Sequence, residues 1–119
     1  MDKYVDGFVI PISQENVKKY SAIAHQAGEI WKEHGALEYI EAVGDDLSHE
    51  NMVSFPQMAG ASDKETVIFA WIVYESKAER DRINAAVMND PRIKEMATGD
   101  KTFDYKRMAY GGFRAIVEF

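Results

Sequence analysis

The sequence contains no cysteine and no cluster of basic residues. Without cysteine the chain forms no disulfide, thiol nucleophile or thiolate metal site, which agrees with a reducing cytosol. Lysine and arginine number 14 against 20 aspartates and glutamates, so the net charge is -6. A phosphate backbone or an anionic membrane surface repels such a chain. Neither nucleic acid nor a membrane is therefore expected as a partner.

Long apolar runs are also missing. No segment approaches the roughly 20 apolar residues that span a bilayer, and charged residues interrupt the N-terminal Met1–Asp6, so no signal peptide is predicted. We expect a soluble, cytoplasmic protein. A length of 119 residues predicts one domain, 1–119, large enough for a real core.

The most hydrophobic stretch, Thr66–Tyr74, predicts a central strand with two apolar faces. Val67, Phe69, Trp71 and Val73 alternate with Ile68, Ala70 and Ile72, so both faces require a cover. A chain this short has few helices for two faces. We therefore expect a second copy of the chain over one of them.

The first half of the chain predicts strand, helix and strand. Tyr4–Ile12 alternates as a strand, in which Pro11 should end the pairing because it lacks an N–H. Ser13 is a plausible N-cap for a helix that runs to about His34 and is closed by Gly35. Residues 36–43 read as the second strand.

The second half repeats this order after an arm. Met52–Phe55 predicts a short edge strand before the central one, since Pro56 follows it. Ser76 and Glu79 form a capping box, and that helix should end before Pro91. Residues 92–97 predict a further helical turn and 98–105 a loop. Residues 106–119 predict a last strand with a bulge or close backbone approach at its paired glycines.

Two strand–helix–strand halves in one small domain predict an α+β, ferredoxin-like βαββαβ fold with an extra hairpin arm. Such a sheet carries helices on one face only. The apolar second face of the central strand then favours a partner subunit over water.

Short segments spread in order along nearly the whole chain carry a family resemblance: Tyr4-Val5-Asp6-Gly7-Phe8, His34-Gly35-Ala36-Leu37-Glu38, Phe69-Ala70-Trp71-Ile72-Val73-Tyr74, Arg80-Asp81, Asp90-Pro91-Arg92, Lys106-Arg107-Met108 and Tyr110-Gly111-Gly112-Phe113. They resemble the YbaA-like family, bacterial proteins of unknown function. The resemblance implies ferredoxin-like subunits that pair sheet to sheet as a dimeric α/β barrel. Cofactor-free monooxygenases, haem-degrading enzymes and binding proteins share that architecture, and no catalytic residue carries over from the family.

Asp6 and Glu41 are the candidate catalytic residues, because each lies among apolar neighbours on a predicted strand face. A carboxylate there is costly unless paired, and burial would raise its pKa toward that of a general base. Arg107, on the last strand, is the natural counter-charge. The alternative is that each carboxylate is held by a structural partner or points to water at a strand end.

Aromatic side chains are the candidate ligand contacts. With Arg107, the predicted ligand-binding residues are Trp31, Tyr39, Trp71 and Tyr110, which can line a pocket for an apolar or planar molecule or else form core and dimer interface. His25 and Glu29 lie one helical turn apart without a further ligand, so no metal site and no cofactor are predicted.

Three functions remain open from the residues. The first is a homodimeric small-molecule-binding protein with its pocket between sheet and helices. The second is a cofactor-free monooxygenase or isomerase in which Asp6 or Glu41 is the general base. The third is a purely structural dimer without a ligand.

Overall fold

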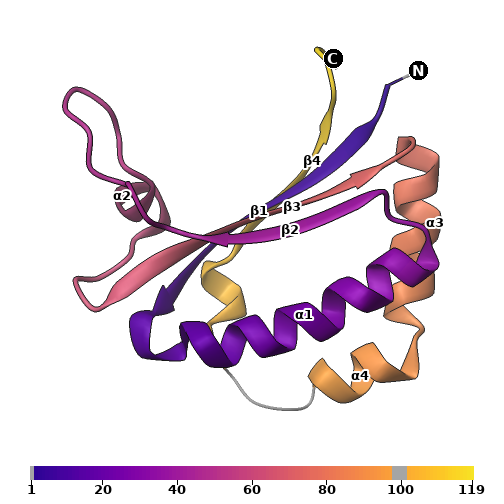
Figure 1. Cartoon of the computed structure of the whole chain (residues 1–119), viewed down its shortest axis with the longest axis horizontal. Coiled ribbons are helices and arrows are strands. Elements are labelled where there is room, and N and C mark those ends of the chain that lie inside the picture. The colour runs from indigo at the N-terminus through magenta and orange to yellow at the C-terminus, as the bar shows by residue number, and fades with distance from the viewer. Residues whose placement is uncertain (1, 98–101) are drawn as a thin grey trace.

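The computed structural model describes residues 2–97 and 102–119. Its elements are β1 (Tyr4–Ser13), the 3-10 turn η1 (Gln14–Asn16), α1 (Val17–His34), β2 (Glu38–Val43), α2 (Phe55–Ala59), β3 (Glu65–Tyr74), α3 (Lys77–Met88), α4 (Pro91–Ala97), the 3-10 turn η2 (Tyr105–Arg107) and β4 (Ala109–Arg114). The four strands form one antiparallel sheet in the order β2-β3-β1-β4 (Figure 1). The predicted α+β, ferredoxin-like arrangement is confirmed.

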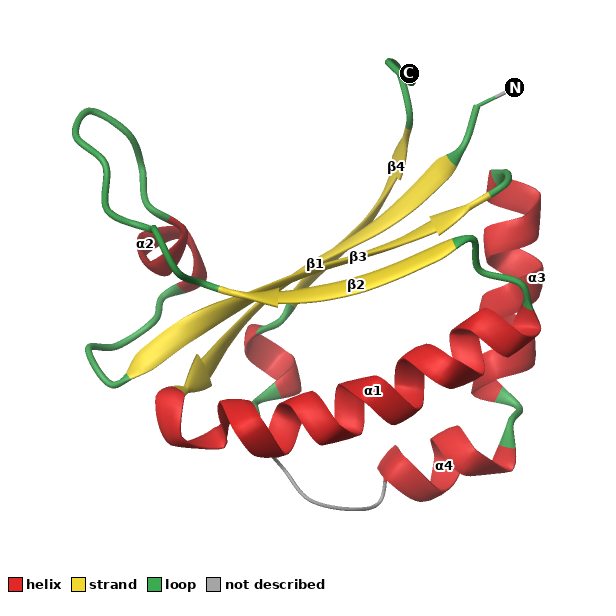
Figure 2. Cartoon of the chain, viewed as in Figure 1, coloured by secondary structure: helices red, strands yellow, loops and turns green. Residues whose placement is uncertain are grey.

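Helices α1, α3 and α4 cover one face of the sheet, and α2 rises with its flanking loops from the other side (Figure 2). The helix-covered face of β3 presents Ile68, Ala70 and Ile72, each at most 4% exposed. They join two core clusters that also contain Tyr20 and Ala24 of α1. We call the other side of the sheet the open face.

The open face is largely apolar, although the register also places Glu38 of β2 and Glu65 of β3 on it. The strand register places these side chains on it: Ile40 and Ala42 of β2, Val67, Phe69, Trp71 and Val73 of β3, Val5, Gly7 and Val9 of β1, and Ala109, Gly111 and Phe113 of β4. The residues Phe69 and Phe113 are 43% and 62% exposed. The predicted two-sided apolar character of β3 is confirmed.

Several local predictions hold. Gly35 closes α1 in the left-handed conformation, with φ of 118°. The Ser76 hydroxyl accepts from the backbone N–H of Glu79 at the start of α3, which ends at Met88, before Pro91. Residues 91–97 form α4. Part of the predicted loop after α4, residues 98–101, lies outside the described residues.

Three predicted details in the first part of the chain are wrong. Pro11 does not end β1, because it lies past the last β1–β4 pair, where its missing N–H costs no bond to that strand. Ser13 makes no side-chain cap, and η1 precedes α1. Residues 52–54 form no strand: Ser54 caps α2 in a capping box with Gln57.

The last strand is shorter than expected, and its glycines make no bulge. β4 pairs with β1 in continuous register, with Gly111 opposite Gly7 and Gly112 opposite Asp6. A Cβ at Gly112 would lie 2.5 Å from the Tyr4 hydroxyl oxygen. The glycine therefore allows a close approach to the backbone, which was the alternative to a bulge in the sequence analysis.

Candidate functional site

Asp6 lies in a sealed network between the sheet and α3. It is 1% exposed, and its carboxylate accepts from Arg80 Nη1 at 3.0 Å, the Tyr74 hydroxyl at 3.1 Å and Asn84 Nδ2 at 3.4 Å. Burial, then the charge of Asp6, raises the pKa of Tyr74. The Asp6 carboxylate is therefore compensated by a guanidinium and two neutral donors.

Two aromatic residues predicted as ligand contacts belong to the same network. The Tyr110 hydroxyl accepts from Arg80 Nη1 at 2.8 Å, and Asn84 Oδ1 accepts from Trp31 Nε1 at 3.1 Å. The Arg80 guanidinium also lies 4.8 Å from the centroid of the Tyr4 ring. Trp31 and Tyr110 thus approach Asp6 through polar contacts.

Glu41 lies at the floor of a groove between α1 and β2. Its carboxylate accepts from the Tyr20 hydroxyl at Oε1 and from the Tyr39 hydroxyl at Oε2, the latter at 2.5 Å. Burial, then the negative charge of Glu41, raises the pKa of both tyrosines, so the two phenols stay protonated donors across the neutral pH range. None of the ion pairs found within 2–97 and 102–119 includes Glu41.

This α1–β2 groove measures about 640 Å³. Its lining comes from α1, β2 and β3: Val17, Tyr20, Ser21, Ala24, His25, Gly28, Glu29, Lys32, Glu33, Tyr39, Glu41, Ala42, Val43 and Ile68. Gly28 is required where α1 crosses Tyr39, since a Cβ there would lie 2.8 Å from a carbon of the Tyr39 ring. The volume is in the range of sites that hold small organic molecules.

The remaining predicted residues lie elsewhere. Trp71 is on the open face, and its Nε1 donates to Glu38 Oε1 at 3.0 Å. Arg107 is bound to Glu65, with Nη1–Oε2 at 2.8 Å, and to the Gly60 carbonyl at 2.8 Å. The prediction that Arg107 is the counter-charge is therefore wrong, and Arg80 has that place at Asp6.

Sequence reasoning missed Arg80 and Asn84 as partners of Asp6. Both lie on the side of α3 that faces the sheet, next to the fully buried Ile83 and Val87. Their spacing of four residues was the available signal. The His25–Glu29 pair, at 3.1 Å, is largely exposed, and no group of three or more possible metal ligands occurs in the described part of the chain.

A second hollow, of about 560 Å³, lies between the chain ends and is lined by Asp2, Arg114, Ala115, Ile116 and Glu118. No predicted site residue lines it. Helices of the described ranges are all too short or too polar to cross a membrane.

The fold is similar to that of several solved proteins. A dimeric ferredoxin-like protein from an uncultured marine organism aligns over 100% of both chains, with a TM-score of 0.64 and 8% identity. SnoaB, a cofactor-independent oxygenase from Streptomyces nogalater, aligns over 99% of this chain and 97% of its own, with a TM-score of 0.65 and 13% identity. At such identities the likeness shows the fold alone.

Sequence comparison gives the family. The uncharacterized protein YbaA of Escherichia coli K12 is 40% identical over 116 residues, 98% of each chain. Residues 3–105 match the model described as "Protein of unknown function (DUF1428)". The chain belongs to this DUF1428 family, as its resemblance to YbaA-like proteins predicted.

Proposed function

We propose that the protein is a homodimer that binds a small molecule in the α1–β2 groove of each subunit. The observation that carries this proposal is the position of Glu41 at the floor of a groove of about 640 Å³. Two phenols donate hydrogen bonds to its carboxylate, and none of the described ion pairs joins it to a cation. A half-buried carboxylate without a counter-ion is costly to keep. A ligand that donates a hydrogen bond or a positive charge to this carboxylate offsets that free-energy cost.

The groove and the open face lie on opposite sides of the sheet. Glu41 alternates with Ile40 and Ala42 along β2, and pairs with Ala70 on the helix-covered face. A second copy on the open face therefore leaves both grooves accessible. Each subunit then has a complete site of its own.

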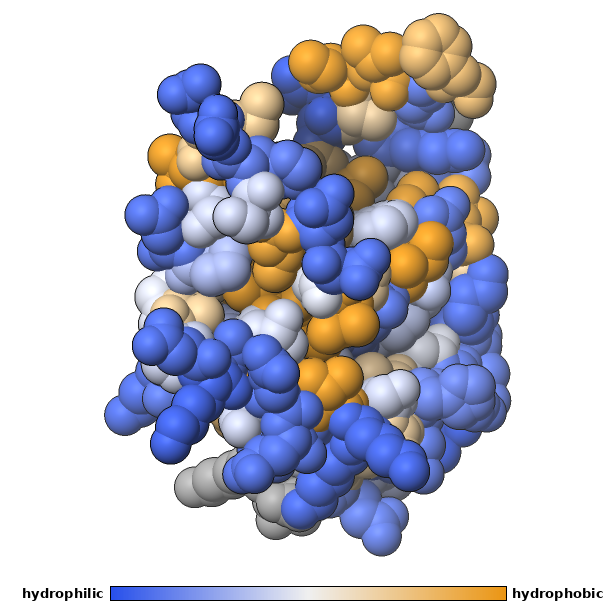
Figure 3. Space-filling model, turned by 60° about the vertical axis from the view of Figure 1, so that its left-hand side comes forward, coloured by the Kyte–Doolittle hydropathy of each residue, from blue (hydrophilic) through white to orange (hydrophobic). Residues whose placement is uncertain are grey.

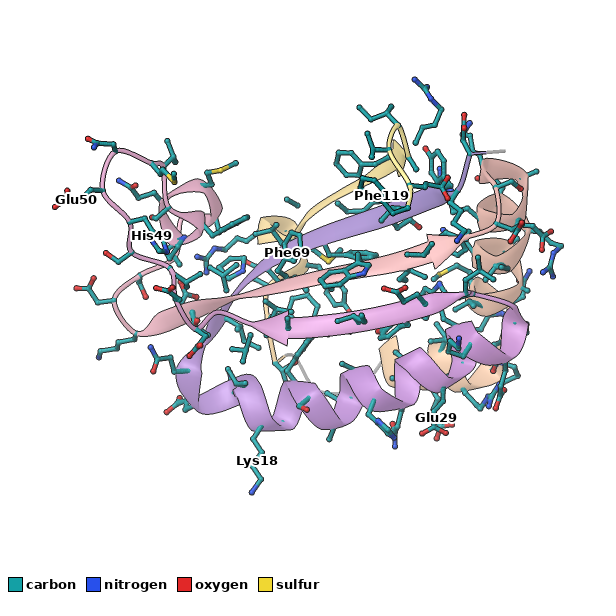
Figure 4. All side chains as sticks on the ribbon, turned by 45° about the horizontal axis from the view of Figure 1, so that its top comes forward. Lys18, Glu29, His49, Glu50, Phe69 and Phe119 are labelled. Carbon is teal, nitrogen blue, oxygen red and sulfur yellow. The ribbon has the colours of Figure 1, made fainter. Side chains whose placement is uncertain are left out.

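Support for the homodimer comes from apolar side chains that no described part of the chain covers. The arm, residues 44–64 between β2 and β3, contributes Met52, Val53 and Met58, each more than 70% exposed. The C-terminal tail, residues 115–119, contributes Ile116, Val117 and Phe119. Arm and tail rise on the same side of the sheet, where Figure 4 shows Phe69 and Phe119. Hydrophobic side chains gather at the top of the molecule and in a band below it (Figure 3). Large exposed apolar patches mark protein–protein interaction sites.

Blocking the groove tests the binding proposal. Ser21 is exposed and lines the groove, whereas its neighbour Ala22 is exposed and does not. Compounds that raise the melting temperature of the wild type in a library screen should lose that effect in Ser21→Trp and keep it in Ala22→Trp. The absence of any stabilising compound, or equal binding by both variants, contradicts the proposal.

A charge on the open face tests the dimer. Phe113→Glu adds a carboxylate to the open face on the edge strand β4, where Phe113 is 62% exposed. Met88→Glu makes the same kind of change on α3, where Met88 is 53% exposed. Light scattering should find a dimer for the wild type and for Met88→Glu, and a monomer for Phe113→Glu. A monodisperse wild-type monomer at micromolar concentration refutes this part.

A second candidate function is a cofactor-free monooxygenase or isomerase, favoured by the position of Glu41 in the groove. In this case Glu41 removes a proton from an activated substrate, as the two phenols hold the carboxylate in place. Asp6 lines neither hollow, and its role as a base stays a prediction. A turnover screen in which Glu41→Gln is as fast as the wild type excludes Glu41 as the base; Asp6→Asn tests the other carboxylate in the same way.

A further inference from the structure

The polar floor of the groove offers acceptors to a ligand and keeps its own donors occupied. The hydroxyl groups of Tyr20 and Tyr39 already donate their hydrogen bonds to Glu41. Each oxygen of a carboxylate has a second lone pair, and each phenol oxygen also accepts. A ligand group that meets these three side chains must therefore supply the hydrogen-bond donors.

The carboxylates at the rim of the groove are already paired. Glu29 lies 3.1 Å from His25, and Glu33 lies 2.6 Å from Arg92. Figure 4 places Glu29 on the side of α1 that points away from the sheet. These pairs are exposed and contribute little field at the floor.

Lysine at the rim does not neutralise the floor. The ammonium of Lys32 donates to the backbone carbonyl of Leu37 at 2.8 Å. No ion pair in residues 2–97 or 102–119 joins it to Glu41. The floor keeps a net negative charge, in a chain whose net charge is -6. An anionic ligand is repelled there and a cation is attracted.

The walls add an apolar surface beside this charge. Val17, Ala24 and Ile68 line the groove with the two tyrosine rings. An ammonium at Glu41 also lies against aromatic rings, whose faces attract cations. The volume of about 640 Å³ accommodates a body of several carbon atoms behind the charged group.

We propose that the α1–β2 groove recognises a primary ammonium group on an apolar body, with Glu41 as the counter-ion and the Tyr20 and Tyr39 oxygens as further acceptors. The inference rests on the proposed binding function and adds the chemical class of the ligand. It assigns Glu41 a specificity role that sequence reasoning did not give it.

Three probes with one body test the proposal by isothermal titration calorimetry at pH 7: 4-phenylbutylamine, 4-phenylbutan-1-ol and 4-phenylbutanoate. The amine should bind about tenfold more tightly than the alcohol, because its ammonium forms an ion pair with the Glu41 carboxylate that a neutral hydroxyl cannot form. The carboxylate should bind most weakly. In Glu41→Gln the affinity for the amine should fall about tenfold, while that for the alcohol changes less than about twofold.

Glu75→Gln is the matched control, since it removes an exposed carboxylate outside the groove and should leave the amine affinity unchanged. Circular dichroism melts of each variant check the fold. The inference is overturned if the alcohol or the carboxylate binds as tightly as the amine, or if Glu41→Gln keeps the wild-type preference. Probe binding that Ser21→Trp abolishes, but that shows no preference for the amine, refutes the ligand class and leaves the binding function standing. Failure of all three probes to bind refutes both.

Discussion

Replacing Asp6 by asparagine tests whether the sealed network under α3 is held together by charge. Asp6 is 1% exposed and the side chain of its partner Arg80 is 15% exposed, so the pair is largely removed from water. Asparagine keeps the size of the side chain but removes the charge. It also turns an NH2 group toward side chains that donate hydrogen bonds to Asp6 in the wild type.

The magnitude follows from the contacts that are lost. Breaking a buried ion pair by removing one partner costs about 3–5 kcal/mol. Arg80 keeps part of its compensation, because its Nη1 still donates to Tyr110 at 2.8 Å and its Nε lies 3.0 Å from Asp81 Oδ1. We therefore expect Asp6→Asn to lower the free energy of unfolding by about 2–4 kcal/mol, a large part of the stability of a small domain.

Urea denaturation at one fixed protein concentration measures this change, since the proposed dimerisation would make stability depend on concentration. Arg80→Met and the double variant complete a cycle, in which the double variant should be about 2 kcal/mol more stable than additivity predicts. Asp81→Asn is the control: this partner of Arg80 is 61% exposed, and its loss should cost less than about 1 kcal/mol. Equal effects of Asp6→Asn and Asp81→Asn, or an additive cycle, refute the reasoning.

Three further predictions concern the groove and a surface pair. Gly28→Ala should lower the melting temperature because the added methyl overlaps Tyr39, although alanine favours helix by about 1 kcal/mol. The additional change Tyr39→Leu should restore the melting temperature. A higher melting temperature of Gly28→Ala alone contradicts the packing. Glu65 has its pKa lowered to about 2, chiefly by the hydrogen bond from Arg107, so its stabilisation is complete above its unfolded pKa near 4.5 and is lost as the pH falls through about 2. The melting temperatures of wild type and Glu65→Gln should accordingly differ at pH 7 and converge near pH 2, whereas a constant difference contradicts the pairing. Glu41→Gln should lower the pKa of Tyr39 toward its ordinary value while burial keeps it raised, as ultraviolet titration of phenolate absorbance measures; an unchanged titration refutes the contact.

Local patterns in the sequence were sufficient for most elements. Alternation along Thr66–Tyr74 predicted both faces of β3, and Gly35 and Ser76 marked helix ends, because these signals depend on a few adjacent residues. The arm was misread for a comparable reason. Met52–Phe55 has strand-like residues, but the Ser54–Gln57 capping box, also local, begins a helix there.

The identities of the two carboxylates were also readable from sequence, since a charged residue at an inward-facing strand position demands a partner. Their partners were not. Arg80 reaches Asp6 across 74 residues, and Tyr20 reaches Glu41 across 21, so only the packing of α3 and α1 on the sheet decides these contacts. That packing also separates their roles: α3 seals Asp6 under a guanidinium, whereas the groove beside α1 leaves Glu41 at its floor. The sequence by itself determined which residues are charged and which face of each strand they occupy. Tertiary structure alone decided that one carboxylate is paired with a guanidinium inside the protein and that the other lies in a groove, because helix docking sets which cations and hydroxyls come within bonding distance.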